Sequence, residues 1–393
     1  MTMNRRQFLR TSLSAAVACA LDGAVVGASF AAAPAGADYR HLLVLIELKG
    51  GNDGLNTLVP FSDPAYYALR PKLAIARDSV VPLSDRAGLH PSLAPLQALW
   101  AARELAVLQG VGYPAPNLSH FRSIEIWDTA SRSEEYLQDG WLTRTFAAAP
   151  APATFAADGV IIGSADLGPL TGGGTRAVTL ANPDQFVRQA RLAMPDGAAS
   201  NRSLAHILKV EADIVQAAAN LGARRAFTTQ FPSGGFGASI RTAAQVIAAP
   251  AGVAVVRITL SGFDTHSGQT ATQARLLGEL AAGIVALKSA LLELGRWSDT
   301  LVLTYAEFGR RPKENLSNGT DHGTASVHFA LGGRVRGGLY GEQPSLARLG
   351  GDGNTGFALD FRSVYATVLE RWWGVPSVAT LGGKFPVLPL VNA

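Results

Sequence analysis

The chain has 393 residues, of which 48% are hydrophobic, 16% charged and 8% aromatic, with 42 glycines and a formal net charge of +4. This composition excludes a disordered chain, which would be poorer in apolar residues, and a collagen-like chain, in which glycine repeats every third position. The length accommodates one large α/β domain or two ordinary ones.

The first 37 residues have the pattern of an export signal, with a charged start, an apolar stretch and small residues from Ala35 to Ala37. The pair Arg5 and Arg6, followed by Gln7-Phe8-Leu9, resembles the bacterial twin-arginine signal, whose cargo crosses the membrane folded. We therefore predict export by the twin-arginine machinery and a periplasmic or secreted location. An ordinary secretory signal and an uncleaved anchor are the alternatives.

Removal of this signal changes the chemistry that the remaining chain offers. The signal contains three arginines and one aspartate, so the formal net charge falls from +4 to +2, and no basic run suggests a nucleic-acid partner. It also contains the single cysteine, Cys19, which excludes a disulfide and a catalytic thiol in the mature chain. Asp22 argues against Cys19 as a lipoprotein acceptor. After residue 37 no apolar stretch is long enough for a transmembrane span.

Four apolar runs predict buried strands, because they are rich in β-branched residues or leucine and end at glycine-containing turns. A further strand is expected shortly after them. Helical patterns lie between the runs, for example at Ser203–Leu221 and Ala271–Leu294. This alternation predicts an α/β fold with a mostly parallel sheet sandwiched by helices. The five expected strands are Leu42–Leu48, Leu105–Leu108, Val253–Leu260, Thr300–Thr304 and Val327–Leu331.

We expect residues 38–393 to form a single domain. Its Ala-rich region from about 140 to 250 offers no candidate site residue and is predicted to be helical covering or an insertion.

Acidic and imidazole side chains follow the ends of these strands. Because ligands bind beyond the carboxyl ends of parallel strands, the side chains are expected to gather on one rim of the sheet. Carboxylate and imidazole groups suit Zn²⁺, Mn²⁺ or Mg²⁺, so the sequence predicts a centre of one or two divalent ions. Each residue alone also suits a helix cap, a turn or an ion pair. The candidate metal ligands are Asp53, Asp264, His266, Glu307, Asp321 and His322.

The other histidines outside the site segments lack this setting. His41 and His206 are expected to be structural, and His90 precedes a proline, as expected for a residue at a helix entry. His328 falls in an apolar run and is expected in the core.

Five segments together resemble the bacterial family DUF1501, a family of unknown function, over essentially the whole mature chain. That family is similar to the alkaline phosphatase and sulfatase superfamily, which implies a central, mostly parallel sheet with a metal centre at its carboxyl edge. The segments are Gly50–Asn56 (GGNDGLN), Asn117–Phe121 (NLSHF), Gly262–His266 (GFDTH), Glu307–Arg310 (EFGR) and Gly319–Gly323 (GTDHG).

The resemblance also implies roles for single residues. Asp264 and His266 resemble the superfamily's Asp and His pair, although two residues apart where four is common, and His322 resembles its final metal-ligand histidine. Glu307 stands where the superfamily has an Asp-His pair, and Asp53 would bridge or hold one metal.

The candidate catalytic residues are Ser119, His120 and Arg310. Ser119 precedes a helical pattern, where the superfamily places its nucleophile and where the helix dipole stabilises an anion; a plain N-cap is the alternative. His120 is a candidate acid, base or ligand. Arg310 or Arg311 is a candidate clamp for an anionic substrate, and surface charge is the alternative. A formylglycine sulfatase motif is absent from the mature sequence.

The sequence therefore predicts an exported, metal-dependent hydrolase of a phosphate, phosphonate or sulfate ester, acting on a small-molecule or polysaccharide substrate. The main alternative is a catalytically degenerate scaffold that binds a polysaccharide or a protein at the cell envelope. A metal-dependent isomerase or phosphotransferase is a third possibility.

Overall fold

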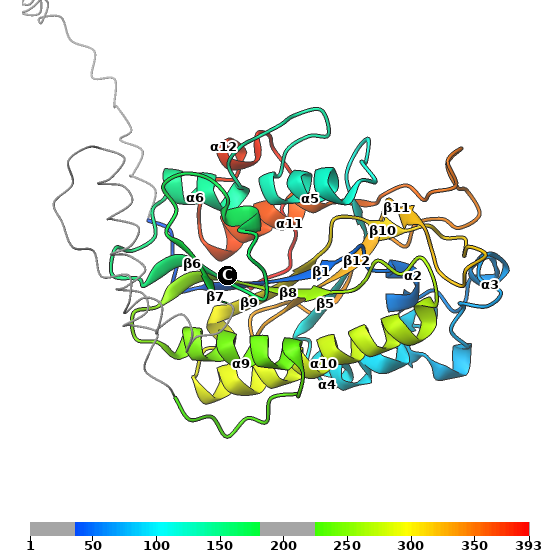
Figure 1. Ribbon diagram of the computed structural model, residues 1–393, viewed down its shortest axis with the longest axis horizontal. Helices are drawn as coiled ribbons and strands as arrows, with labels where there is room; N and C mark the ends of the chain where they lie inside the picture. The colour runs from blue at the N-terminus through cyan, green and yellow to red at the C-terminus, as the bar shows by residue number, and fades with distance from the viewer. Residues whose placement is uncertain (1–35, 181–224, 393) are drawn as a thin grey trace, which may run out of the picture. The chain divides into compact units, whose positions relative to one another are not determined.

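The computed structural model describes residues 36–180 and 225–392 (Figure 1). These residues belong to one compact unit that begins at Gly36. The predicted export signal, apart from its last two residues, and the predicted helix Ser203–Leu221 with His206 lie outside the described residues. Within those ranges no helix has the length and apolar character that crossing a membrane requires.

The described residues form a central sheet of nine strands in the order β13-β5-β12-β9-β1-β8-β6-β7, with β14 also paired to β5. The described pairs of this sheet are parallel except those of β12, which is antiparallel to β5 and β9. The predicted mostly parallel α/β sheet is therefore confirmed. The strands are β1 (Leu42–Lys49), β5 (Leu105–Gly112), β6 (Ala157–Ile162), β7 (Ala177–Leu180), β8 (Val253–Ser261), β9 (Thr300–Tyr305), β12 (Ser326–Leu331), β13 (Gly338–Gly341) and β14 (Leu359–Asp360).

Helices cover both faces of the sheet (Figure 1). One face packs against η2 (Pro91–Leu96), α4 (Gln97–Ala101), α9 (Gly235–Ala248) and α10 (Gln269–Glu293). The other packs against α5 (His120–Thr129), α6 (Trp141–Ala148), α11 (Phe361–Thr367) and α12 (Val378–Leu381).

The shorter elements are α2 (Gly54–Thr57), α3 (Pro64–Leu69), β2 (Leu58–Val59), β3 (Val81–Pro82), β4 (Gly88–Leu89), β10 (Gly309–Arg310), β11 (His322–Gly323), η1 (Arg77–Ser79), η3 (Gly168–Leu170), η4 (Trp297–Asp299) and η5 (Val368–Trp372).

The central strand β1 explains why the strands read as unbroken apolar runs. Val44 and Ile46 pack into the core under α9 and α10, whereas Leu43 and Leu45 pack into the core on the opposite face. A strand buried on both faces needs apolar residues at successive positions, without the alternation of a half-exposed strand. All five expected strands and the helix expected at Ala271–Leu294, now α10, are present.

The Ala-rich region from 140 to 250 contributes more than helical cover. Its described part contains α6 and α9, and also the strands β6 and β7, which the sequence analysis does not predict. These strands extend the sheet beyond β8 in parallel register. The sequence of β6, ADGVII, begins with Asp158 and Gly159 after its first alanine and so carries a weak strand signal.

The direction of β12 decides which residues reach the carboxyl edge of the sheet. Because β12 is antiparallel to β5, its first residue, Ser326, pairs with Val111 near the end of β5. The residues before β12, including His322, therefore lie at the edge where β1, β5, β8 and β9 end. A parallel strand would have delivered them to the opposite edge.

Three histidines that the sequence predicts to have structural roles contact the rest of the fold as expected. His90 caps η2, with its ring nitrogen accepting a hydrogen bond from the Ser92 amide at 3.0 Å. His41 stacks on Trp372 and lies 2.8 Å from its carbonyl oxygen. His328 is buried in β12.

The turn after β1 requires a residue without a side chain. Gly50 has a φ of +116°, and a Cβ there would lie 2.3 Å from the backbone nitrogen of Asp264. The close approach of this turn to the loop after β8 is therefore possible only with glycine.

We expect Gly50→Ala to lower the free energy of unfolding by about 2 kcal/mol or more, because it combines an unfavourable φ with a backbone clash. Gly173→Ala is the matched control, since Gly173 has no positive φ and no atom within 4 Å of an added Cβ. Urea unfolding of both variants measures the difference, and equal stabilities would contradict the role assigned to Gly50.

Burial lowers the pKa of His328 to about 3, and neither ring nitrogen has a hydrogen-bond partner in the described chain. Because the unfolded chain binds a proton near pH 6.5 and the folded chain does not, stability is lost as the pH falls below 6.5. This residue alone is expected to remove about 2 kcal/mol between pH 7 and pH 5. His328→Leu should flatten that decline in urea unfolding, and an unchanged pH slope would contradict the assignment.

Candidate metal centre

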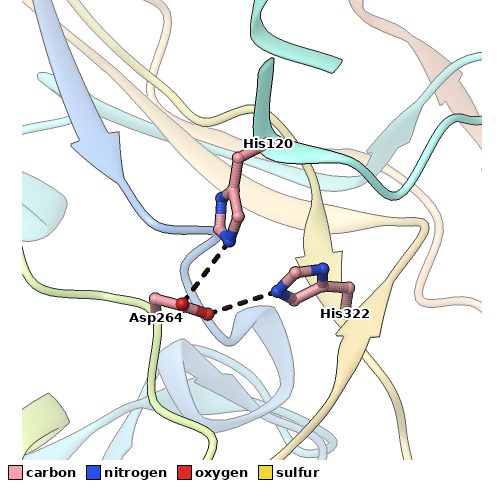
Figure 2. A group of neighbouring side chains, drawn as sticks. All are labelled: His120, Asp264 and His322. Atoms are coloured by element: carbon pink, nitrogen blue, oxygen red, sulfur yellow. Dashed lines mark hydrogen bonds and ion pairs between the residues drawn. The ribbon is translucent and has the colours of Figure 1, made fainter. Parts of the chain in front are cut away.

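Three side chains from distant parts of the chain converge at the carboxyl edge of the sheet (Figure 2). His120 is the first residue of α5, Asp264 lies in the loop after β8, and His322 lies in β11. One nitrogen or oxygen atom from each lies within 4.8 Å of the others, a spacing suited to a metal ion. The structure thus brings together three of the nine predicted site residues around one point, and others surround them.

The ring of His322 is oriented by a backbone carbonyl. Its Nδ1 lies 2.8 Å from the carbonyl oxygen of Leu118, which can only accept a hydrogen bond, so Nδ1 carries the proton. In the neutral ring, Nε2 then carries no proton and presents a lone pair. It faces Asp264 Oδ1 at 3.2 Å and His266 Nε2 at 2.9 Å. Burial lowers the pKa of His322, which favours the neutral form that binds metals.

The ring of His120 is oriented by a buried carboxylate. Its Nδ1 lies 2.8 Å from Oε1 of Glu307, and its Nε2 lies 3.5 Å from Oδ2 of Asp264. Glu307 is buried and also accepts a hydrogen bond from the Gly50 amide at 2.9 Å. The hydrogen bond to Glu307 raises the pKa of His120. Glu307 therefore lies behind His120, where it fixes the ring and its Nδ1 proton.

His266 also lies next to Asp264 and His322. Its Nδ1 lies 3.4 Å from Oδ1 of Asp321, and its Nε2 lies 3.1 Å from Oδ1 of Asp264. Asp321 accepts a hydrogen bond from Asn315 at 3.2 Å, and this bond is the main cause that lowers the Asp321 pKa. The ionised Asp321 carboxylate can therefore accept a hydrogen bond from Nδ1 of His266.

The three imidazoles share one pattern: each Nδ1 is next to an oxygen acceptor, and His120, His266 and His322 each direct Nε2 toward Asp264. Lone pairs gathered around a carboxylate repel one another unless a cation or a proton lies among them. A second hydrogen bond that fixes the tautomer is typical of histidine ligands of metals. Three imidazole nitrogens and one carboxylate oxygen form a donor set that fits zinc, whereas Mg²⁺ and Ca²⁺ prefer oxygen ligands.

The position of Asp264 combines access to solvent with a nearby positive charge. Its side chain is 46% exposed, so a small molecule can approach the group from solvent. Although burial opposes the ionised form, the hydrogen bond from Arg310 at 2.6 Å holds the pKa of Asp264 below its ordinary value. The carboxylate is therefore ionised and available as a ligand at neutral pH.

Asp53 lies apart from this group, in a buried ion pair. Its two oxygens accept from Arg70 at 2.5 and 3.0 Å, and Gln269 donates to Oδ2 at 2.5 Å. Asp53 also caps α2 through the Leu55 and Asn56 amides. The structure thus places this predicted ligand in the support of the turn after β1.

Ser119 and Arg310 have opposite surroundings. Ser119 is the N-cap residue of α5, is exposed, and makes no side-chain capping hydrogen bond, which leaves its hydroxyl open to solvent beside His120. Arg310 is fully buried, with its guanidinium on Asp264 and backbone carbonyls.

Sequence reasoning does not identify the residues that hold Asp53. Arg70 and Gln269 lie 17 and 216 positions from it. Neither belongs to a segment that the motif analysis singles out, because a buried partner carries no local sequence signal.

The fold and the site together define an α/β protein with a candidate divalent-metal centre at the carboxyl edge of its sheet. The chain belongs to the family described as "Protein of unknown function (DUF1501)", whose model matches residues 85–377. No curated protein matches the chain.

Solved structures that the chain resembles have low sequence identity to it. The C-terminal periplasmic domain of EcEptC from Escherichia coli, in complex with Zn, is 8% identical, with 74% of this chain and 72% of that chain covered and a TM-score of 0.37. The PsFucS1 sulfatase from Pseudoalteromonas sp. is 12% identical, with 88% and 70% covered and a TM-score of 0.38. The phosphonate monoester hydrolase of Agrobacterium radiobacter is 12% identical, with 88% and 78% covered and a TM-score of 0.35.

We expect Glu307→Gln to weaken zinc binding by about 10- to 100-fold, because the His120 ring loses the charge that fixes its tautomer. Glu314→Gln is the matched control, since Glu314 accepts hydrogen bonds from the Lys72 and Leu73 amides and none from an imidazole. Competition titration against a chromophoric zinc chelator measures both affinities. Wild-type affinity in the Glu307 variant would contradict this role.

Proposed function

We propose that this chain is an exported, metal-dependent hydrolase of a phosphate, phosphonate or sulfate ester. His120, Asp264 and His322 hold a divalent ion, with His266 as a fourth ligand. The observation that carries the proposal is the shared orientation of the three imidazoles, each with Nδ1 beside an oxygen and Nε2 directed at one carboxylate. The Nε2 atoms of His266 and His322 lie 2.9 Å apart and both face Oδ1 of Asp264, so one divalent ion placed among them can bind all three groups.

Each surrounding group has a role in holding this arrangement. A zinc ion held by these residues would supply a Lewis acid that stabilises anionic charge and would lower the pKa of a bound water to about 7. Glu307 and the Leu118 carbonyl hold the Nδ1 protons of His120 and His322. Their hydrogen bonds keep both rings in the orientation that presents Nε2.

Ser119 is the nucleophile in this proposal. Its hydroxyl is free and exposed, and it immediately precedes the ligand His120 at the start of a ten-residue helix. The positive end of a helix dipole and the free amide groups there stabilise negative charge on the hydroxyl and on a bound ester. A water molecule is the alternative nucleophile.

The proposed function includes export of the protein from the cytoplasm. The pair Arg5 and Arg6 supports export by the twin-arginine machinery to the periplasm or beyond, where a small-molecule or polysaccharide ester is the substrate.

Metal analysis of the purified protein tests the proposal together with assays on nitrophenyl phosphate, phosphonate and sulfate esters. The wild-type protein is expected to contain zinc or manganese and to cleave at least one ester, and Asp264→Asn to lose both properties. Ser119→Ala should retain the metal and lose at least about 100-fold in kcat, because a nucleophile acts only in the chemical step. Ser317→Ala, another exposed serine at this edge, is the control.

A wild-type protein that binds none of these metals would overturn the proposal. A wild-type protein that binds metal but cleaves none of these esters would instead favour the envelope-binding scaffold.

A further inference from the structure

Arg310 is a buried cation that contacts the candidate metal centre through Asp264. It lies in β10, and its side chain is 0% exposed. Each of its three guanidinium nitrogens is engaged within the protein. Nε donates to Gly51 O at 2.8 Å and Nη1 to Thr320 O at 2.9 Å, while Nη2 donates to Asp264 Oδ1 at 2.6 Å, to Phe263 O at 3.0 Å and to Gly50 O.

These partners belong to three segments that meet only in the folded chain. Gly50 and Gly51 form the turn after β1, Phe263 and Asp264 follow β8, and Thr320 comes two residues before His322. The turn after β1 also supports Glu307 through the Gly50 amide. Buried carbonyls need hydrogen-bond donors. The Arg310 guanidinium supplies them to the loops that carry the candidate ligands Asp264 and His322, and to the turn that supports Glu307.

We propose that Arg310 is a positioning residue of the metal centre, which pins Oδ1 of Asp264 and fixes the ligand loops, and that it does not clamp the substrate. The inference rests on the proposed function. A substrate clamp needs free N–H groups facing solvent, and this side chain has no exposed surface. Lysine retains the charge and lacks the planar fork, so it cannot replace these bonds.

A second buried arginine provides a matched comparison. Arg70 is also 0% exposed. It donates to two backbone carbonyls directly after Arg310 in the chain, Pro312 O at 2.8 Å and Arg311 O at 3.0 Å. Its carboxylate partner is Asp53, which lies outside the group of ligands. Arg70→Lys therefore removes a comparable network without touching Asp264.

Zinc affinity and the absorption spectrum of the Co²⁺-loaded protein test the proposal on the purified chain. Arg310→Lys is expected to lower zinc affinity about 10- to 100-fold, as changes next to metal ligands do, and to alter the Co²⁺ spectrum at saturation. Arg70→Lys is expected to leave both the zinc affinity and the spectrum of the Co²⁺-saturated protein unchanged.

The results separate the alternatives. Wild-type zinc affinity and spectrum in Arg310→Lys, with a raised KM for the ester, would overturn the positioning role and favour a substrate clamp. Equal losses in both lysine variants would also overturn it, because the effect would then be general to the loops. A wild-type protein that binds neither ion contradicts the proposed function itself, and the positioning role fails with it.

A measurement on the wild-type protein covers the case in which Arg310→Lys does not fold. Nuclear magnetic resonance of arginine-labelled protein should show the Arg310 Nε–H exchanging slowly with solvent and shifting when zinc is added. Exchange as fast as in free arginine would overturn the proposal, because an engaged and buried guanidinium is protected from solvent.

Discussion

The carboxylate of Asp264 joins a buried arginine to the imidazoles of the candidate metal centre. Its Oδ1 contacts the buried guanidinium of Arg310 and the Nε2 atoms of His266 and His322, and its Oδ2 faces Nε2 of His120. A carboxylate so placed is ionised at neutral pH, which leaves it available to a cation. The turn after β1 lies so close to the loop that carries Asp264 that a Cβ at position 50 would be 2.3 Å from the Asp264 backbone nitrogen.

The arrangement of the sheet explains how residues more than 200 positions apart reach this point. The strands β1, β5, β8 and β9 run in the same direction and end at one edge, so the loops that follow them share that edge. The strand β12 runs the other way, and the residues that precede it arrive there as well. The candidate ligand set therefore combines residues after strands with one, His322, before a strand.

The acidic residues around the centre divide into those that face it and those that support it. Asp264 faces the imidazole nitrogens, whereas Glu307 lies behind His120 and Asp321 lies beside His266. Asp53 is one step further away, where Arg70 and Gln269 neutralise and bind it. The role of a carboxylate in this candidate site is thus set by its neighbours, since the same group serves as candidate ligand, hydrogen-bond acceptor or loop support.

The sequence by itself determines the strands, the long helix α10 and the segments that bear the site, because apolar runs and glycine turns are local signals. It also places Asp264 and His266 on one rim of the sheet, since strand ends share an edge. Only the tertiary structure decides the role of each side chain. The direction of β12, the position of Glu307 behind His120 and the burial of Arg310 depend on contacts between distant segments, and no local pattern encodes which neighbour a charged group will meet.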